Sequence, residues 1–327
     1  MSVMRDTVTV TAAALGIGLA HQAYATARSL RRHSGYEHHV VSCRSGNELS
    51  CYRGDSAGDS RATVLFASGL MNTSTSWLLL ASHLSGVTPV LYDRAGYGRS
   101  LWRSEAPYHL QESVADAADV VKEVCSGTGP VWLAGHSMGG YLVHRLAGQL
   151  DNIAGVILID PMHPREMVVS QPQREGAKAT DLTLRTAPLP VALGAGLLMD
   201  KGGVLSSAAG SPSLGRLRAE ISAASTWYAA AREWRYLYPY LLDGGAPLEQ
   251  VATPVYVIAA EATVAGSSEQ GGLYDEYVAS GSAGGRRLDL EDCDHLSIIN
   301  APQAAPRLAE QVVSLVQERP EPREVTS

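Results

Sequence analysis

The chain has 327 residues, of which 45% are hydrophobic and 18% charged, so it can bury the core of one large domain with an insertion or of two small domains. Its formal net charge of −7, without a basic stripe, excludes nucleic acid as an expected partner. The 4 cysteines show neither Cys-x-x-Cys spacing nor histidines at zinc-finger intervals, so we predict no metal site.

An apolar run near the N-terminus, residues 8–20, allows three interpretations. A cleaved export signal fits the length of the run and the small residues Ala23-Tyr24-Ala25 behind it. A membrane anchor needs about 20 apolar residues and would carry His21 and Gln22 into the bilayer. The third interpretation is a peripheral or packed helix, associated at most weakly with a membrane through residues 8–27.

Three arginines favour the third interpretation. Arg28, Arg31 and Arg32 follow the apolar run directly, and positive charges at this place resist translocation across a membrane. We therefore expect a cytoplasmic protein whose N-terminal segment, residues 1–35, is helical, with export as the alternative.

From residue 36 onward, short apolar runs alternate with amphipathic segments. Residues 40–43 and 49–52 read as an opening hairpin, across which Cys43 and Cys51 face each other; we expect free thiols there, with a disulfide as the alternative. Further strands are predicted for residues 62–67, 87–92, 131–134, 153–159, 254–261 and 286–290. This alternation predicts an α/β fold built on a mostly parallel, doubly wound sheet.

The strand at 131–134 leads into Gly135-His136-Ser137-Met138-Gly139, and a helical pattern follows at once. Such a sharp turn from strand to helix leaves no room for side chains beside the serine, so glycines are needed on both sides. The Ser137 hydroxyl is expected to stand exposed above the sheet edge. The helix behind it directs the free N–H of Met138 toward a developing negative charge.

With these motifs, the span from Tyr36 to Val316 resembles the α/β-hydrolase family. The resemblance implies an eight-stranded sheet and a nucleophilic serine at Ser137. It also implies that His295 is the general base, because this histidine lies between the last strand and a closing helix predicted for residues 301–316. The segment Asp93-Arg94-Ala95-Gly96-Tyr97-Gly98-Arg99-Ser100 matches a turn of the family, which makes a structural role for Asp93 the expectation.

A second oxyanion donor is implied by the same resemblance. In the family, the strand matching residues 62–67 commonly ends in His-Gly, and the next residue supplies a backbone N–H to the oxyanion hole. Here Ser68 replaces the histidine, and Leu70 inherits the role. Because the role needs only an N–H and a close approach at Gly69, the substitution leaves the chemistry intact.

The position of the acid departs from the family pattern. In most members it follows the next-to-last strand, and the expected position falls on or near Thr263 in this sequence, where there is no aspartate. Some members carry it one strand earlier, so Asp160 is the first candidate and Glu261 the second, whereas Asp294 is too near the histidine in sequence to reach round it. A carboxylate is required because it fixes the imidazole tautomer and stabilises the imidazolium.

The domain organisation follows from where strand patterns occur. Residues 36–160 and 251–318 form the predicted hydrolase core, residues 161–250 a helical lid insertion without strands, and residues 319–327 a polar tail. Aromatic residues gather in the insertion, and three of them are expected to line a substrate pocket: Trp227, Tyr228 and Trp234.

Together these features predict a cofactor-independent serine hydrolase that cleaves an ester or thioester of an apolar small molecule through an acyl-enzyme. The same residues would also serve an acyltransferase or a carbon–carbon bond hydrolase. An alternative from a different functional class is a non-catalytic protein that binds a small ligand on this scaffold. Epoxide hydrolase chemistry is disfavoured, because on this fold those enzymes use a carboxylate at the position of Ser137.

Overall fold

The computed structural model describes residues 2–55, 62–125, 129–199 and 203–318. The polar tail predicted for residues 319–327 lies outside the described residues.

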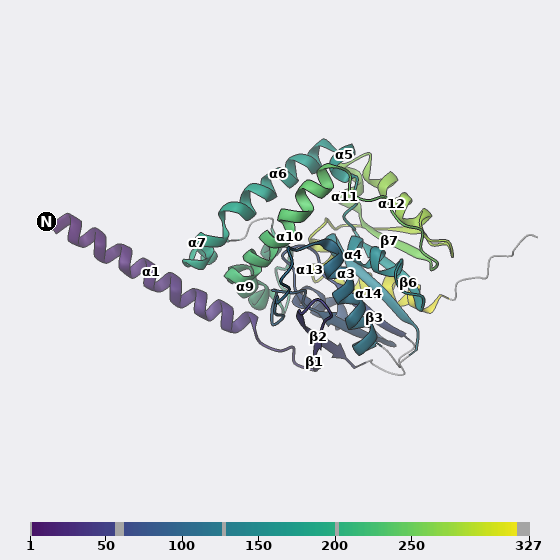
Figure 1. The fold of residues 1–327 in the computed structure, drawn as a ribbon, viewed down its shortest axis with the longest axis horizontal. Helices are drawn as coiled ribbons and strands as arrows, with labels where there is room; N and C mark the ends of the chain where they lie inside the picture. Colours follow the sequence, from purple (N-terminus) through teal and green to yellow (C-terminus); the bar gives the residue numbers. More distant parts are fainter. Residues whose placement is uncertain (1, 56–61, 126–128, 200–202, 319–327) are drawn as a thin grey trace, which may run out of the picture.

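The strands form one eight-stranded sheet with the order β1-β2-β4-β3-β5-β6-β7-β8. In Figure 1 the sheet lies among the helices in the body of the molecule. The hairpin strands are antiparallel to their neighbours, and β3 to β8 run parallel, so the predicted mostly parallel sheet is confirmed. The strands are β1 (Tyr36–Ser42), β2 (Glu48–Gly54), β3 (Ala62–Ala67), β4 (Val87–Tyr92), β5 (Val131–His136), β6 (Ile153–Ile159), β7 (Val255–Ala260) and β8 (Arg287–Leu290).

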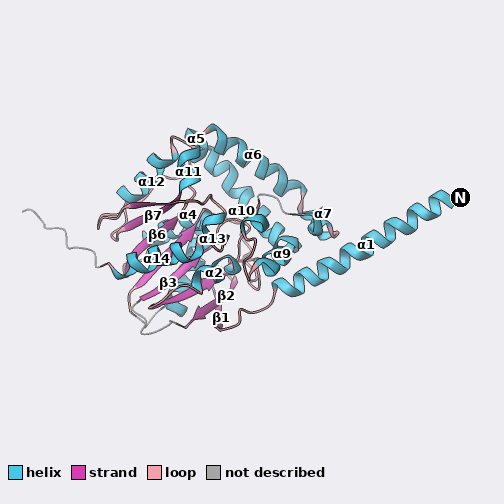
Figure 2. Ribbon diagram, turned by 180° about the vertical axis from the view of Figure 1, so that it is seen from behind, coloured by secondary structure: helices cyan, strands magenta, loops and turns pink. Residues whose placement is uncertain are grey.

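Helices cover both faces of the sheet (Figure 2). On one face pack α3 (Leu110–Val120), continued by a π-helical turn (Val121–Cys125), α4 (Met138–Ala147) and α12 (Gln270–Ala279). On the other face pack the 3₁₀ helix η1 (Ser74–Trp77), α2 (Leu78–Ala81), α13 (Ser297–Asn300) and α14 (Ala305–Gln317). All residues of β3, β4 and β7 are buried, because strands covered on both sides have no solvent face.

The closing helix begins later than its sequence pattern suggests. We predicted one helix from residue 301, but α13 ends at Asn300 and α14 starts only at Ala305. Ala301 has an extended backbone, with φ of −81° and ψ of 134°. It precedes Pro302, whose ring disfavours a helical conformation in the residue before it.

The segment between β6 and β7, residues 161–250, is called the helical insertion below. It contains α5 (Glu166–Val169), α6 (Gln171–Thr186), α7 (Pro188–Ala192), the 3₁₀ helix η3 (Ala195–Leu198), α8 (Val204–Ser207), α9 (Leu214–Ser222) and α10 (Ala224–Leu242). Its described residues form no strand, as expected. In Figure 1 its helices lie over one end of the sheet, teal to green.

The N-terminal helix α1 (Ser2–Ser29) points away from the body of the molecule at its start (Figure 1). Its later part packs on the helical insertion: Gly18 lies so close to Leu193 that a side chain would not fit, and Arg28 Nε donates to the Gly215 carbonyl at 3.2 Å. Among the described residues, no helix is long and apolar enough to span a bilayer.

All 4 cysteines are free and buried. The expectation of unpaired thiols at Cys43 and Cys51 is therefore confirmed, although both lie deeper than a hairpin surface suggests, at 7% and 0% exposure.

Gly139 allows α4 to pass directly beneath the end of β3. A Cβ at this residue would overlap the carbonyl oxygens of Ala67 and Ser68, which are fixed in the backbone. We expect Gly139→Ala to lower the free energy of unfolding by at least about 2 kcal/mol in urea titrations, because overpacking against backbone cannot relax.

Gly272 provides the matched control, because it lies in α12 and a Cβ there would meet nothing within 4 Å. Gly272→Ala should be neutral or stabilising by up to about 1 kcal/mol, since alanine favours the helix. Equal unfolding midpoints for Gly139→Ala and the unmodified protein would contradict the close approach.

Candidate active site

The carboxyl ends of the parallel strands meet at one edge of the sheet and bring the predicted site residues together. Ser137 follows β5, Asp160 follows the adjacent β6, and His295 lies in the loop after β8. Open α/β sheets bind ligands at this edge. Residues separated by up to 158 positions in sequence thereby come within hydrogen-bonding distance.

Ser137 has a strained backbone, with φ of 54° and ψ of −125°. Residues other than glycine rarely adopt such backbone angles, which cost on the order of 1–3 kcal/mol. The turn is held by its surroundings: a Cβ at Gly135 would overlap the Gly139 carbonyl, and the Ser137 N–H donates to the Ile159 carbonyl at 3.2 Å. The hydroxyl is thereby presented to the cavity above the sheet.

A chain of hydrogen bonds joins the three residues. Ser137 Oγ lies 3.1 Å from His295 Nε2, and His295 Nδ1 lies 2.6 Å from Asp160 Oδ2. An ionised carboxylate can only accept, so Nδ1 carries the ring proton and Nε2 is left to accept the serine hydroxyl proton. This is the arrangement in which imidazole serves as a base toward serine.

Asp160 is completely buried and hydrogen-bonded on both oxygens. Oδ1 accepts from the Ala260 N–H at 2.9 Å and from the Tyr274 hydroxyl at 3.0 Å, and Oδ2 also accepts from the Thr263 hydroxyl at 2.8 Å. Burial by itself would raise the pKa of this carboxyl, but the hydrogen bond and charge of His295, with the Ala260 N–H, hold it below its usual value.

Thr263 explains the departure from the family pattern. It stands on or near the position where the resemblance placed the acid, and its hydroxyl donates to an acid that comes from the neighbouring strand end. The side chain at the usual position thus serves the carboxylate instead of supplying it.

The pKa of His295 is raised above its ordinary value. Burial lowers it, but the hydrogen bond and the charge of Asp160 more than offset that effect. The ring still has 43% of its side-chain surface exposed toward the cavity. Behind this ring, His136 Nε2 lies 2.8 Å from the His295 carbonyl oxygen. Burial lowers the pKa of His136 to about 3, so the His136 ring is neutral and its Nε2–H donates this hydrogen bond.

The other candidate acids lie elsewhere. Glu261 Oε2 accepts from the Asp292 N–H at 3.0 Å on the surface. Asp294 Oδ1 accepts from the N–H groups of Leu296 and Ser297 at 3.0 and 2.8 Å, which caps the turn before α13. Neither contacts the His295 ring through a hydrogen bond.

The two residues predicted to form an oxyanion hole lie beside Ser137 in the cavity wall. Leu70 follows β3 and Met138 begins α4, and both residues line the cavity. Neither N–H has a protein acceptor within the described part of the chain. Unpaired donors beside the serine are what an oxyanion would need.

Ser68, which stands where the family commonly has histidine, braces the loop that carries Leu70. Its hydroxyl donates to the Thr73 carbonyl at 2.9 Å and accepts from Trp77 Nε1 at 2.9 Å. Asp93 is buried and accepts from the N–H and hydroxyl of Ser74 at 2.8 and 2.7 Å, in keeping with a structural role.

The cavity above Ser137 has a volume of about 510 Å³. Its walls come from the strand ends, from α5 and α6 of the helical insertion, and from the segment between β7 and α12. This volume suits a small molecule.

Of the three aromatic residues predicted to line the pocket, only Trp234 does so. The prediction is wrong for Trp227, which is 1% exposed and donates from Nε1 to the Ile221 carbonyl at 2.7 Å inside the core. It is also wrong for Tyr228, which lies in a separate hollow of about 380 Å³ between α6, α7 and α10.

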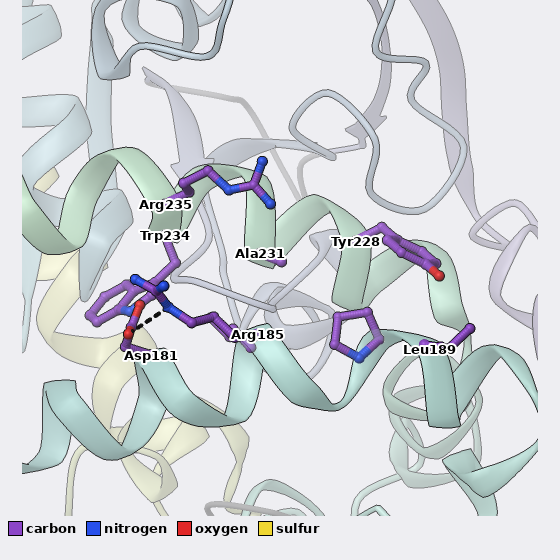
Figure 3. A pocket seen from close by; sticks show the side chains of 9 residues that line it. Asp181, Arg185, Leu189, Tyr228, Ala231, Trp234 and Arg235 are labelled. Atoms are coloured by element: carbon purple, nitrogen blue, oxygen red, sulfur yellow. Dashed lines mark ion pairs between the residues drawn. The ribbon is translucent and has the colours of Figure 1, made fainter.

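Figure 3 shows this second hollow, with Tyr228 beside Leu189 at one end and Trp234 beside the ion pair of Asp181 and Arg185 at the other. Successive residues of a helix point about 100° apart, so Trp227 and Tyr228 have different surroundings. Trp234 lines both hollows and separates them.

Among the described residues, no group of three or more histidine, cysteine, aspartate and glutamate side chains is arranged to hold a metal ion.

The model of the alpha/beta hydrolase family matches residues 64–307, which is most of the chain. This protein belongs to the α/β-hydrolase family. It is 35% identical over 101 residues to the lipase LipV of Mycobacterium tuberculosis. That alignment covers 31% of this chain and 37% of the lipase, so the similarity spans little more than a third of that relative.

Solved structures share the fold of this α/β hydrolase at low sequence identity. An epoxide hydrolase from Vigna radiata has a TM-score of 0.67 and 18% identity, with 86% of this chain and 98% of that chain covered. A candidate acyltransferase from Salmonella enterica has a TM-score of 0.65 and 15% identity, with 86% and 96% covered. These likenesses concern the fold alone.

A buried ion pair in this hydrolase joins the helical insertion to the loop that carries Leu70. Arg94, after β4, pairs with Glu233 of α10, at 2.8 Å from Nε to Oε1 and 3.0 Å from Nη2 to Oε2. The same guanidinium donates to the carbonyls of Ser68 and Gly69, the latter at 3.0 Å. No sequence pattern predicts this pair, because the two residues lie 139 positions apart.

We expect Glu233→Ala to lower the free energy of unfolding by about 3 to 5 kcal/mol, because it leaves the Arg94 charge buried without a partner. Chemical denaturation measures the change. Arg94 and Glu233 have 3% and 1% of their side-chain surfaces exposed, so solvent cannot replace the lost carboxylate.

Glu276→Ala is the matched control. It breaks the pair of Glu276 with Arg165, which is equally short at 2.9 Å but about half exposed, and should cost less than about 1 kcal/mol. If Glu233→Ala and Glu276→Ala lowered the free energy of unfolding equally, the buried pair would not stabilise the fold more than the exposed one.

Proposed function

We propose that this α/β hydrolase is a serine hydrolase that cleaves an ester or thioester of a small molecule through an acyl-enzyme. The observation that carries the proposal is the continuous hydrogen-bonded chain from Ser137 through His295 to Asp160, with distances of 3.1 and 2.6 Å. The partial similarity to a lipase agrees with ester cleavage.

In the proposed mechanism, Ser137 Oγ attacks the carbonyl carbon while His295 Nε2 accepts its proton. Asp160 keeps the ring in the required tautomer and stabilises the imidazolium that forms. The negative charge that develops on the carbonyl oxygen is held by the N–H groups of Leu70 and Met138, near the N-terminus of α4.

The tetrahedral intermediate then collapses. His295 gives its proton to the leaving alcohol or thiol, and the acyl group stays on Ser137 as an ester. Water, deprotonated by His295, attacks this ester; the acid leaves and the serine recovers its proton. Each proton transfer uses the same imidazole nitrogen, and the steps need no cofactor.

The substrate is proposed to have an apolar body. Met138, Met162, Met167, Ala177 and Trp234 line the cavity and would contact it. Cleavage at a serine is favoured over epoxide opening, because Ser137 stands where epoxide hydrolases of this fold use a carboxylate.

A fluorophosphonate probe tests the proposal, since such probes modify activated serines. We expect stoichiometric labelling of the folded protein and none of Ser137→Ala, with the modified residue identified by mass spectrometry. Hydrolysis of a panel of activated esters and thioesters should be lost in the same variant. Folded protein that remains unlabelled would support a ligand-binding role on the hydrolase scaffold instead.

The role of Asp160 is tested with two amide variants. Asp160→Asn should lower kcat by about three to four orders of magnitude, because asparagine cannot stabilise the imidazolium or fix its tautomer. Glu261→Gln should stay within about twofold of the unmodified enzyme, since Glu261 bonds the Asp292 N–H on the surface. Steady-state kinetics on one activated ester measures both, and a nearly fully active Asp160→Asn would refute the assignment.

A further inference from the structure

One ionisable side chain in the cavity has no part in the mechanism above. Glu166 is the first residue of α5, six positions after Asp160 in the loop that leaves β6, and it lines the same cavity as Ser137 and His295. It is a carboxyl group in the same cavity as the reacting atoms, and it makes no hydrogen bond to Ser137 or His295.

The backbone fixes Glu166 through one oxygen only. Oε2 accepts from the His163 N–H at 2.9 Å, and the Glu166 N–H donates back to the His163 carbonyl at 3.1 Å. The other carboxyl oxygen has no hydrogen-bond partner among the described residues. One oxygen therefore orients the group, and the other stays available to a ligand.

Apart from the His295 ring, the described residues of the cavity wall offer this carboxyl no cationic side chain. The described residues that line the cavity include no lysine or arginine. Arg165, the preceding residue, is turned away and pairs with Glu276 at 2.9 Å outside the cavity. A partly desolvated carboxylate without a partner is costly, and a ligand that brings a positive charge would remove that cost.

The groups around Glu166 come from several elements. Its carboxyl interacts electrostatically with Asp160 after β6, with His295 after β8, and with Tyr274 and Tyr277 of α12. Asp160 repels its charge, His295 attracts it when protonated, and both tyrosines are neutral because burial raises their pKa. The surroundings thus favour a cation in the cavity and disfavour an anion.

We propose that Glu166 makes this cavity selective for esters that carry an ammonium group, binding the cation while Ser137 attacks the carbonyl. The inference rests on the proposed function and narrows its substrate class to amine-bearing esters. The apolar wall then contacts the rest of the molecule, and the carboxylate oxygen without a protein partner contacts the cation.

The selectivity should depend on pH. Burial raises the pKa of Glu166 to about 7, although the His163 N–H lowers it somewhat. Below this value the carboxyl is protonated and attracts a cation weakly; above it the carboxylate is charged. Preference for a cationic ester should therefore grow as pH rises through about 7 and disappear as pH falls.

Pairs of esters that have the same shape but differ in charge separate the effect of charge from the effect of shape. One pair is the choline ester of butanoic acid and its neutral isostere, in which tert-butyl replaces trimethylammonium. The second pair carries the same replacement in the acyl part of a p-nitrophenyl ester. The measured quantity is the ratio of kcat/KM for the cationic ester to that for the neutral ester, from about pH 6 to 8, which cancels the titration of His295 common to both.

We expect the ratio to exceed about tenfold at the upper pH for at least one pair, and to fall to about one in Glu166→Gln. Glutamine can still accept from the His163 N–H, so the α5 turn keeps its support. Glu261→Gln, which removes an equal charge outside the cavity, should retain the full ratio and its pH dependence.

A ratio near one for both pairs, or a ratio that Glu166→Gln leaves unchanged, would overturn the inference. Failure of the proposed function looks different: neither member of any pair would be cleaved, and Ser137 would not be labelled by a fluorophosphonate. Efficient cleavage of neutral esters without a charge preference would reject only the role of Glu166.

Discussion

The carboxylate of Asp160 is the interaction on which the site depends. A fully buried charge would be expensive on its own, but four donors surround this one: the Ala260 N–H, the hydroxyls of Thr263 and Tyr274, and the ring of His295. The donors come from the end of β7, from the α11 turn (Glu261–Gly266), from α12 and from the loop after β8. One side chain therefore ties the second half of the sheet to the histidine loop, and the position of the imidazole is set by the packing of these elements.

A second buried charge, the guanidinium of Arg94, holds the loop after β3 that carries Leu70. Arg94 draws the carbonyls of Ser68 and Gly69 toward itself and is neutralised by Glu233 of α10. Because a peptide has its N–H opposite its carbonyl, holding the Gly69 carbonyl orients the N–H of Leu70. The helical insertion is thus part of the scaffold that supports the candidate oxyanion hole. Its two sides differ: α10 is anchored by this pair, whereas α5 and α6 form the cavity wall that carries Glu166.

The distribution of charge around the cavity follows from these two anchors. Asp160 lies behind His295, and Glu166 lies in the wall, while the buried guanidinium of Arg94 is already paired. Glu166 is the one Asp or Glu side chain among the described residues that line the cavity, so its charge and that of the His295 ring set the electrostatic character of the cavity. Aromatic rings contribute less than their number in α10 suggests, because the helix turns Trp227 into the core and Tyr228 toward a separate hollow.

The sequence by itself determined the elements and the motif residues: the apolar runs predicted every strand, and the glycines around Ser137 predicted a sharp turn that only glycine permits, since any Cβ there would overlap the backbone. Only the tertiary structure decided which carboxylate meets His295, because Asp160 and Glu261 follow adjacent strands and differ in the direction of their side chains. It likewise decided the partner of Arg94, since long-range pairing depends on how the insertion docks onto the sheet. Local periodicity encodes burial and secondary structure, whereas contacts across more than a hundred positions arise only once the layers have packed.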